Sequence, residues 1–294
     1  MKELFSLISL IISLLLSTKA TVFQFSPRAL PLIKQAVDSP RLSARSALLV
    51  DVDSGTVIFQ KNPHFRLNPA SITKMTTAIA ALEIYPVDEI ITVKAAYPVG
   101  KTMNLEADEK ISVENLIYGL LIHSANDAAF VLAGQQPKKV KTFIERMNQL
   151  AEELGLKDTH FVNFDGEDDL GHYSTAWDLA QLSRWALRDN IFIQAVGTRE
   201  ISVWDVRKEI SHHLETTNEL LGVVPEIKGI KTGWTPIAGE CFVSLIQLEN
   251  RRLISVVLNS NNRFGDTKTL VNWAKQSISW RDYSSSHSNE TAGT

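Results

Sequence analysis

The sequence predicts an α/β (α+β) fold: an antiparallel β-sheet flanked by helices, together with a mainly helical subdomain. Two observations lead to it. Apolar, strand-like runs stand near both ends of the chain and are joined by short turns, as in antiparallel hairpins, while helical patterns fill the middle. In addition, the chain has 294 residues, 44% of them hydrophobic, so it can bury a sizeable core without dividing into several domains.

Strands are predicted at residues 46–51, 55–60, 90–94, 241–248 and 253–258. The turn residues Asp53-Ser54-Gly55 join the first two runs, and Asn250-Arg251 joins the last two. These are hairpin signatures, because polar and glycine residues separate apolar runs of strand length. Lys231-Thr232-Gly233 begins a further strand segment before Cys241.

Helices are predicted at residues 30–37, 114–133, 137–154, 176–187 and 266–277. The helix at 137–154 keeps its apolar side chains on one face and ends at Gly155. The helix at 176–187 has a capping-box-like start, with Asp178 three positions after Thr175. The helix at 114–133 is interrupted by Ser124-Ala125-Asn126. Polar residues inside an apolar run are more typical of a loop that faces a cleft than of a core position.

Charge and composition exclude several classes of protein. The net charge is −3, from 30 basic and 33 acidic residues, so no nucleic-acid partner is indicated. The single cysteine, Cys241, excludes an intrachain disulfide, and its apolar surroundings favour a buried, unreactive side chain. The seven histidines lack H-E-x-x-H or a similar spacing, so no metal is expected.

Three short motifs follow one another along the chain: Ser71-Ile72-Thr73-Lys74, Ser124-Ala125-Asn126 and Lys231-Thr232-Gly233. They read as S-x-x-K, S-x-N and K-T-G, the parts of a serine acyl-transfer site built around lysine. Each motif is weak alone, and Ser260-Asn261-Asn262 also matches the second. Their order and local settings make the set informative.

The first motif has the chemistry of a nucleophile and its base. A serine hydroxyl attacks poorly until a base takes its proton, and on a helix Lys74 lies one turn beyond Ser71. Lysine acts as a base near neutral pH when burial or a second cation, here Lys231, lowers its pKa. In isolation the motif would be read as an N-cap serine and a solvated lysine. The other two motifs favour catalysis.

At these residues the chain resembles the D-alanyl-D-alanine carboxypeptidase family of low-molecular-mass penicillin-binding proteins, in its single-domain form. The likeness runs from about residue 46 to about residue 277, and includes Gly171-His172-Tyr173-Ser174-Thr175-Ala176 and Arg252-Leu253-Ile254 beside the three motifs. It implies a β-lactamase/transpeptidase-like fold with the site in the cleft between sheet and helices. It implies an acyl-enzyme on Ser71, peptidoglycan stem peptides as substrates, β-lactams as inhibitors and no cofactor.

Roles for the remaining site residues follow from these expectations. Lys74 is expected to be the general base, and Ser124 to relay a proton to the leaving amine. The substrate-binding residues are expected to be Asn126, Lys231, Thr232, Gly233, Trp234 and Arg252. The resemblance implies an oxyanion hole from the backbone N–H groups of Ser71 and Trp234. Arg252 suits a substrate carboxylate, although a solvated turn residue is the alternative.

Four segments are expected along the chain: a signal peptide at 1–20, an entry segment at 21–42, a D,D-peptidase catalytic domain at 43–282 and a polar, disordered tail at 283–294. The apolar stretch at 4–16 is too short to span a bilayer, and Thr18 and Ala20 suit a cleavage site. Export to the periplasm or the outer face of the cytoplasmic membrane and cell wall is expected. Membrane contact is expected only if the N-terminal segment stays uncleaved.

Several alternatives stay open. A D,D-endopeptidase that cleaves peptidoglycan cross-links would use the same residues. A class A β-lactamase needs a deacylating glutamate, and Glu167-Asp168-Asp169-Leu170-Gly171 only approaches E-x-x-L-N. A non-catalytic wall scaffold would usually lack Ser71, Lys74 or Lys231, and a β-lactam sensor would be expected to have additional transmembrane spans. His172 and Tyr173 either line the site or pin a loop.

Overall fold

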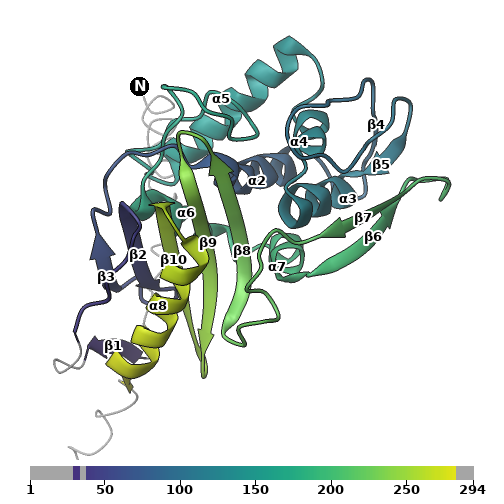
Figure 1. The fold of residues 1–294 in the computed structure, drawn as a ribbon. Helices are drawn as coiled ribbons and strands as arrows, with labels where there is room; N and C mark the ends of the chain where they lie inside the picture. Colours follow the sequence, from purple (N-terminus) through teal and green to yellow (C-terminus); the bar gives the residue numbers. More distant parts are fainter. Residues whose placement is uncertain (1–28, 34–37, 283–294) are drawn as a thin grey trace, which may run out of the picture.

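An antiparallel sheet of five strands runs through the molecule in the order β3-β2-β10-β9-β8 (Figure 1). The computed structural model describes residues 29–33 and 38–282. The strands are β2 (Ser46–Asp51), β3 (Val57–Lys61), β8 (Ile227–Thr235), β9 (Gly239–Leu248) and β10 (Arg251–Ser260). The predicted antiparallel sheet and both of its hairpins are confirmed.

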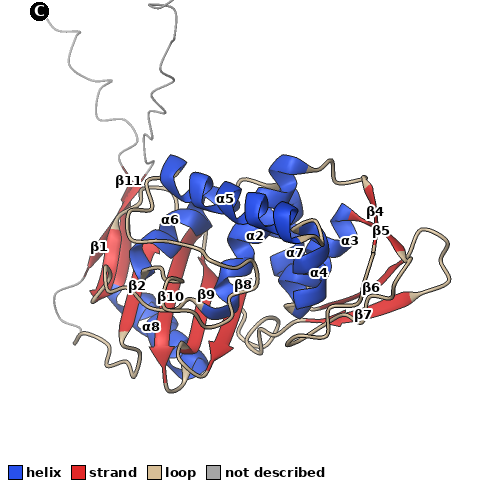
Figure 2. Cartoon of the chain, turned by 90° about the horizontal axis from the view of Figure 1, so that it is seen from above, coloured by secondary structure: helices blue, strands red, loops and turns tan. Residues whose placement is uncertain are grey.

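Helices cover both faces of this sheet (Figure 2). Helix α8 (Arg263–Ser277) packs on β9 and β10 from one side, and α6 (Ala176–Ala186) packs on β2 and β10 from the other. All of β2 is therefore buried, as is a run of six residues in β9 and in β10. Central strands that are covered on both faces have continuous apolar sequences. This is why β2, β9 and β10 could be predicted from the sequence.

The remaining helices form the mainly helical part beside β8. They are α2 (Lys74–Ile84), α3 (Val113–Tyr118), α4 (Asn126–Leu132), α5 (Pro137–Glu153) and α7 (Asn190–Gly197), with a π-helical turn η2 (Gly119–His123) between α3 and α4. The predicted interruption at Ser124 is confirmed, because Ser124 is left-handed with φ 63°. The predicted cap is confirmed too: the Thr175 hydroxyl accepts the Asp178 N–H at 3.0 Å.

The described residues also form three two-stranded antiparallel sheets. They pair β4 (Ile90–Thr92) with β5 (Lys110–Ser112), β6 (Glu200–Trp204) with β7 (Ser211–Glu215), and β1 (Ala29–Ile33) with β11 (Ile278–Asp282). The helix expected at 30–37 is wrong for residues 30–33, which are extended. The reason is tertiary, because β1 finds its hydrogen-bonding partner at the far end of the chain.

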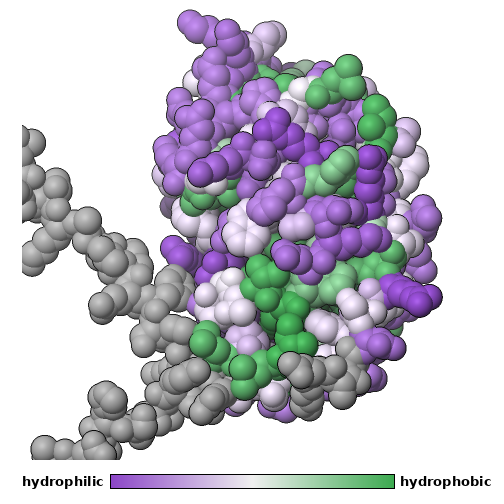
Figure 3. Space-filling view, turned by 90° about the vertical axis from the view of Figure 1, so that its left-hand side faces the viewer, coloured by the Kyte–Doolittle hydropathy of each residue, from purple (hydrophilic) through white to green (hydrophobic). Residues whose placement is uncertain are grey.

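The side of the molecule near β3 is mostly hydrophilic, with apolar side chains gathered in its lower part (Figure 3). Strand β1, low on this side in Figure 1, exposes Leu32 and Ile33. Within the described residues, no helix combines the length and the apolar character needed to cross a membrane. The segments predicted as signal peptide (1–20) and polar tail (283–294) lie outside the described residues.

Candidate active site

Ser71 lies in a single 3₁₀ turn, η1 (Ala70–Thr73), which leads directly into α2. Two glycines from distant segments press against its backbone. A Cβ atom on Gly166 or on Gly233 would stand 2.9 Å from the Ser71 nitrogen, closer than real Cβ contacts allow. Glycine is therefore needed at both positions, and the glycine of the K-T-G motif allows β8 to pack closely against Ser71.

Lys74 is poised to act on Ser71. Its Nζ lies 2.9 Å from Ser71 Oγ and donates to the Asp165 carbonyl at 2.6 Å. The side chain is fully buried, and this desolvation lowers the pKa of Lys74 to about 8, although the charges of Asp165 and Glu167 act in the opposite direction. A substantial fraction of Lys74 is therefore neutral, and able to take a proton, near physiological pH.

A second serine and lysine form a matching pair across the cavity. Lys231 Nζ, from β8, donates to Ser124 Oγ at 2.9 Å and to the Thr232 carbonyl at 3.0 Å. Burial lowers the pKa of Lys231 well below its ordinary value, and the charges of Lys74, Lys101 and Arg263 lower it further. The hydroxyl groups of Ser71 and Ser124 are thus each hydrogen-bonded to a buried amine.

The two pairs meet at a cavity of about 340 Å³. Its lining includes six of the residues predicted from the sequence, namely Ser71, Ser124, Asn126, Thr232, Gly233 and Trp234. Lys74 and Lys231 lie buried beneath it and contact it through the two serines. Trp234 is 61% exposed at the rim. The structure therefore gathers every predicted site residue except Arg252.

Arg252 lies elsewhere, which corrects the expectation that it belongs to the site. It is near the start of β10, where its guanidinium pairs with Asp53 at 3.0 Å. The sheet register explains this, because Val243 of β9 stands between Lys231 on β8 and Val256 on β10. Arg252 is four positions from Val256 on that strand, roughly 13 Å away.

The cavity also has lining residues that the sequence motifs did not indicate: Gly100, Lys101, Glu167, Thr217, Thr235, Pro236 and Arg263. Arg263, the first residue of α8, donates from one terminal nitrogen to the Gly233 carbonyl at 2.9 Å. Its Nε is buried and has no hydrogen-bond partner among the described residues. Thr217 Oγ1 lies 2.6 Å from Thr232 Oγ1. Apart from Glu167, which begins the approximate match to E-x-x-L-N, no local pattern marks these residues, since sheet and helix packing brings them to the site.

His172 and Tyr173 pin a loop and are not among the residues that line the cavity. His172 Nε2 lies 2.7 Å from Thr73 Oγ1, and burial lowers the pKa of His172 to about 4, so the ring is neutral. The Tyr173 backbone pairs with that of His160. Cys241 is buried, as predicted.

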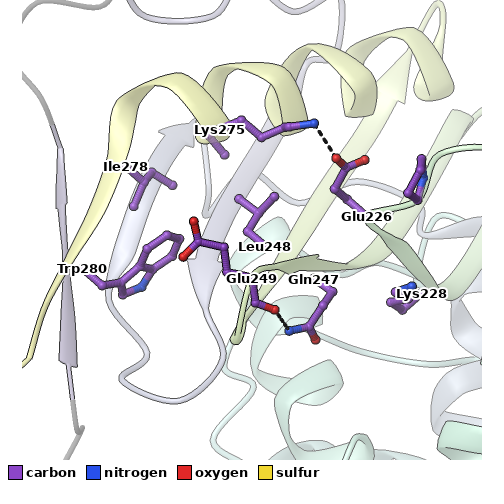
Figure 4. Close-up of a pocket in the computed structure, with 10 residues that line it drawn as sticks. Glu226, Lys228, Gln247, Leu248, Glu249, Lys275, Ile278 and Trp280 are labelled. Atoms are coloured by element: carbon purple, nitrogen blue, oxygen red, sulfur yellow. Dashed lines mark hydrogen bonds and ion pairs between the residues drawn. The ribbon is translucent and has the colours of Figure 1, made fainter.

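A larger cavity, of about 470 Å³, lies at the opposite end of β8 and contains no comparable chemistry (Figure 4). Glu226 pairs there with Lys275 of α8, and Trp280 forms part of the wall. Serine is absent from its lining. In residues 29–33 and 38–282, no group of three or more His, Cys, Asp or Glu side chains is arranged to hold a metal ion. The Ser–Lys pairs therefore single out the smaller cavity as the candidate active site.

Relatives support this choice. DacF of Bacillus subtilis, a D-alanyl-D-alanine carboxypeptidase, is 34% identical over 225 residues, which cover 74% of this chain and 58% of that protein. DacC of Escherichia coli, also named D-alanyl-D-alanine carboxypeptidase, is 32% identical over 271 residues, which cover 86% of this chain and 66% of that protein. The chain thus spans 58% to 66% of the length of these two curated relatives.

The crystal structure of the Streptomyces K15 DD-transpeptidase is similar as well, with a TM-score of 0.77 at 29% identity over 82% of this chain and 100% of that one. A family model described as D-alanyl-D-alanine carboxypeptidase matches residues 33–262, a span that contains all three motifs and both Ser–Lys pairs. The chain belongs to the D-alanyl-D-alanine carboxypeptidase family.

Proposed function

We propose that this protein is a serine-type D-Ala-D-Ala carboxypeptidase that acts on peptidoglycan stem peptides and is acylated by β-lactams. One observation carries the proposal: two serine hydroxyls open into one cavity, and each lies 2.9 Å from the Nζ of a buried lysine. Membership of the family supports the choice of substrate.

In acylation, neutral Lys74 takes the proton of Ser71, and Ser71 Oγ attacks the carbonyl between the two D-Ala residues. The developing oxyanion is held by the backbone N–H groups of Ser71 and Trp234. When the tetrahedral intermediate collapses, Ser124 passes a proton to the departing amine, and Lys231 replenishes it. D-Ala leaves, and an ester on Ser71 remains.

Opposite sides of the cavity hold the two ends of the scissile unit. Lys231, Thr232 and Arg263 present positive charge and a hydroxyl to the carboxylate of the terminal D-Ala. Asn126, on the helical side, binds the amide of the acyl part. Substrate therefore crosses the cavity from α4 to β8.

Before deacylation, the proton that Lys74 took from Ser71 passes through Ser124 to Lys231, which had lost one to the leaving amine. Lys74 is then neutral again and acts as the base for the water that hydrolyses the ester. An amine that enters in place of water would form a new peptide bond, and the similarity to a chain described as a DD-transpeptidase favours testing for this activity as well. Cleavage of cross-linked peptides, the endopeptidase reaction, would use the same acyl-enzyme.

The test begins with a fluorescent penicillin, followed by mass spectrometry of the labelled peptide. The adduct is expected on Ser71 and should vanish in Ser71→Ala. A pentapeptide should release free D-Ala. Label on Ser124 would refute the assignment of the nucleophile, and absence of label would favour a non-catalytic scaffold. Rapid penicillin turnover would favour a β-lactamase, and cleavage of cross-linked dimers alone would favour an endopeptidase.

Export is part of the same proposal, because peptidoglycan lies outside the cytoplasmic membrane. Residues 4–16 have the length and apolar character of a signal-peptide core. Cell fractionation and N-terminal sequencing of the mature protein should find it outside the cytoplasm and cleaved after Ala20. An uncleaved product in the membrane fraction would instead indicate an anchor.

A further inference from the structure

Glu167 carries a carboxylate into a cavity that is otherwise rich in positive charge. Lys101 and Arg263 line this cavity, and Lys74 and Lys231 lie beneath it. Of the described residues that line it, Glu167 alone is acidic. Its charge reaches the reacting groups, because it raises the pKa of Lys74 against the effect of burial. The mechanism described above gives this carboxylate no role.

The side chain lies on the acyl side of the cavity. Glu167 Oε1 is 3.4 Å from Asn126 Nδ2, the amide that would bind the acyl part of the substrate. A Cβ on Gly100 would stand 2.4 Å from the same Nδ2 and 3.4 Å from Glu167 Oε1. Gly100, Asn126 and Glu167 therefore meet at one place, which is formed by α4 and two loops and not by β8 or α8.

The loop that carries Glu167 is held in position from both sides. Asn163 Nδ2 donates to the Glu167 carbonyl at 2.9 Å. The carboxylate of Asp168 accepts from Thr235 Oγ1 at 2.5 Å and from the Ile237 N–H at 3.0 Å, which ties the loop to the β8–β9 turn. Within the described part of the chain, no lysine, arginine or histidine forms an ion pair with Glu167. The backbone that carries Glu167 is thus held in place, and its carboxylate is available to a ligand.

We propose that Glu167 forms a subsite for a positively charged side chain on the acyl part of the substrate, so that the enzyme favours stem peptides with a free amine upstream of D-Ala-D-Ala. This inference rests on the proposed function, because that function sets the direction in which substrate crosses the cavity. Glu167 is exposed, so water screens its interaction with an ammonium group, and the preference is modest.

The experiment compares two peptides that differ in one charge: Nα-acetyl-lysyl-D-Ala-D-Ala, with a free ε-amine, and its Nα,Nε-diacetyl form. Release of D-Ala gives kcat/KM for each. Wild type should favour the charged peptide by roughly two- to fivefold at low salt, and Glu167→Gln should bring the ratio close to one. Any change that the substitution causes in the pKa of Lys74 affects both peptides and cancels in the ratio.

Glu226→Gln is the matched control, since Glu226 lines the distant cavity of Figure 4, and it should keep the wild-type ratio. In wild type the ratio should fall toward one as ionic strength rises from about 0.02 M to about 0.5 M. A preference that persists in Glu167→Gln, or that salt leaves unchanged, overturns the subsite, as do equal rates for both peptides in wild type. Absence of D-Ala release from either peptide would overturn the proposed function, and the subsite with it.

Discussion

Burial gives Lys74 a property that a surface lysine lacks. An exposed amine stays protonated at neutral pH and cannot accept a proton, whereas desolvation lowers the pKa of Lys74 to about 8. The Ser71 hydroxyl, 2.9 Å from its Nζ, lies within range for proton transfer. Position and pKa together suit Lys74 to the proposed role of general base.

The pH dependence of acylation should follow Lys74. Its neutral form is the active one, so the rate constant for acylation by a β-lactam should fall about tenfold per pH unit below about pH 8 and level off above it. Lys74→Arg, which cannot deprotonate in this range, should lower the plateau rate above about pH 8 by roughly 10²- to 10⁴-fold and remove the pH dependence. Stopped-flow acylation from pH 6 to 9 measures both, and a flat wild-type profile would exclude Lys74 as the base.

Arg263 and Arg252 can be compared directly as possible binders of the substrate carboxylate. Arg263 lines the cavity, while Arg252 pairs with Asp53 outside it. Arg263→Leu should raise KM for D-Ala-D-Ala peptides by about 10- to 100-fold, since a charge-assisted hydrogen bond to a carboxylate contributes about 1.5–3 kcal/mol. Arg252→Ala should leave kinetics unchanged. Steady-state assays of D-Ala release decide this, and the reverse pattern would restore Arg252 to the site.

At the scale of elements, the site depends on how closely β8 packs against η1. The edge strand β8 carries Lys231, Thr232 and Gly233 past the turn that contains Ser71. At Gly233 a side chain would meet the Ala70 Cβ and the Ser71 nitrogen, both at 2.9 Å. Ser71, the proposed nucleophile, is thus positioned from the side by a strand as well as by its own helical turn.

Gly233→Ala should separate the two elements and misplace Ser71. We expect a loss of roughly 10²-fold in acylation, the scale of an error of about 1 Å in position, and a loss of about 1–3 kcal/mol in unfolding free energy from overpacking. Gly197→Ala is the matched control, because its nearest new contact is an ordinary 3.7 Å to the Lys228 carbonyl. Penicillin labelling and urea unfolding measure both effects. Wild-type acylation by Gly233→Ala would show that the close approach is dispensable.

At the scale of the whole molecule, buried polar contacts connect distant segments around the cavity. His212 of β7 bonds to the Met103 carbonyl at 2.8 Å and to Glu109 at 2.7 Å, and the Asp127 carboxylate accepts the N–H groups of Met103 and Leu105, each at 3.0 Å. These contacts join the β6–β7 hairpin to the segment that leads from Lys101. The hairpin therefore supports one wall of the cavity from behind.

This connection should make stability depend on pH. Burial lowers the pKa of His212, but the hydrogen bond and charge of Glu109, with smaller contributions from Met103 and Asp127, raise it above 6.5 overall. The folded protein then binds a proton more tightly than the unfolded chain, so His212 stabilises below about pH 6.5, and this is lost as pH rises through the folded pKa.

Urea unfolding of wild type and His212→Gln at pH 6 and pH 8 tests this expectation. The difference in unfolding free energy between the two proteins should be larger at pH 6, because only wild type gains from protonation. His213→Gln, at the exposed neighbouring position, should show no such difference. A wild-type advantage equal at both pH values would mean that His212 does not titrate in this range.

Local patterns alone predicted much of the fold and half of the catalytic pairing. Apolar runs revealed β2, β9 and β10 because both faces of those strands are covered. Ser71 and Lys74 could be paired from spacing, since i and i+3 share a face of a helix. The same patterns failed at β1, whose partner β11 lies at the opposite end of the chain.

The sequence by itself determined the groups proposed to react, which are the two serines and two lysines of the three motifs. Tertiary structure decided which other residues join them. Sheet register directs Arg252 toward Asp53, helix placement brings Arg263 to the cavity, and loop packing adds Glu167. The physical reason is that reactivity resides in single side chains and local spacing, while a cavity wall depends on strand register and packing between segments far apart in the chain.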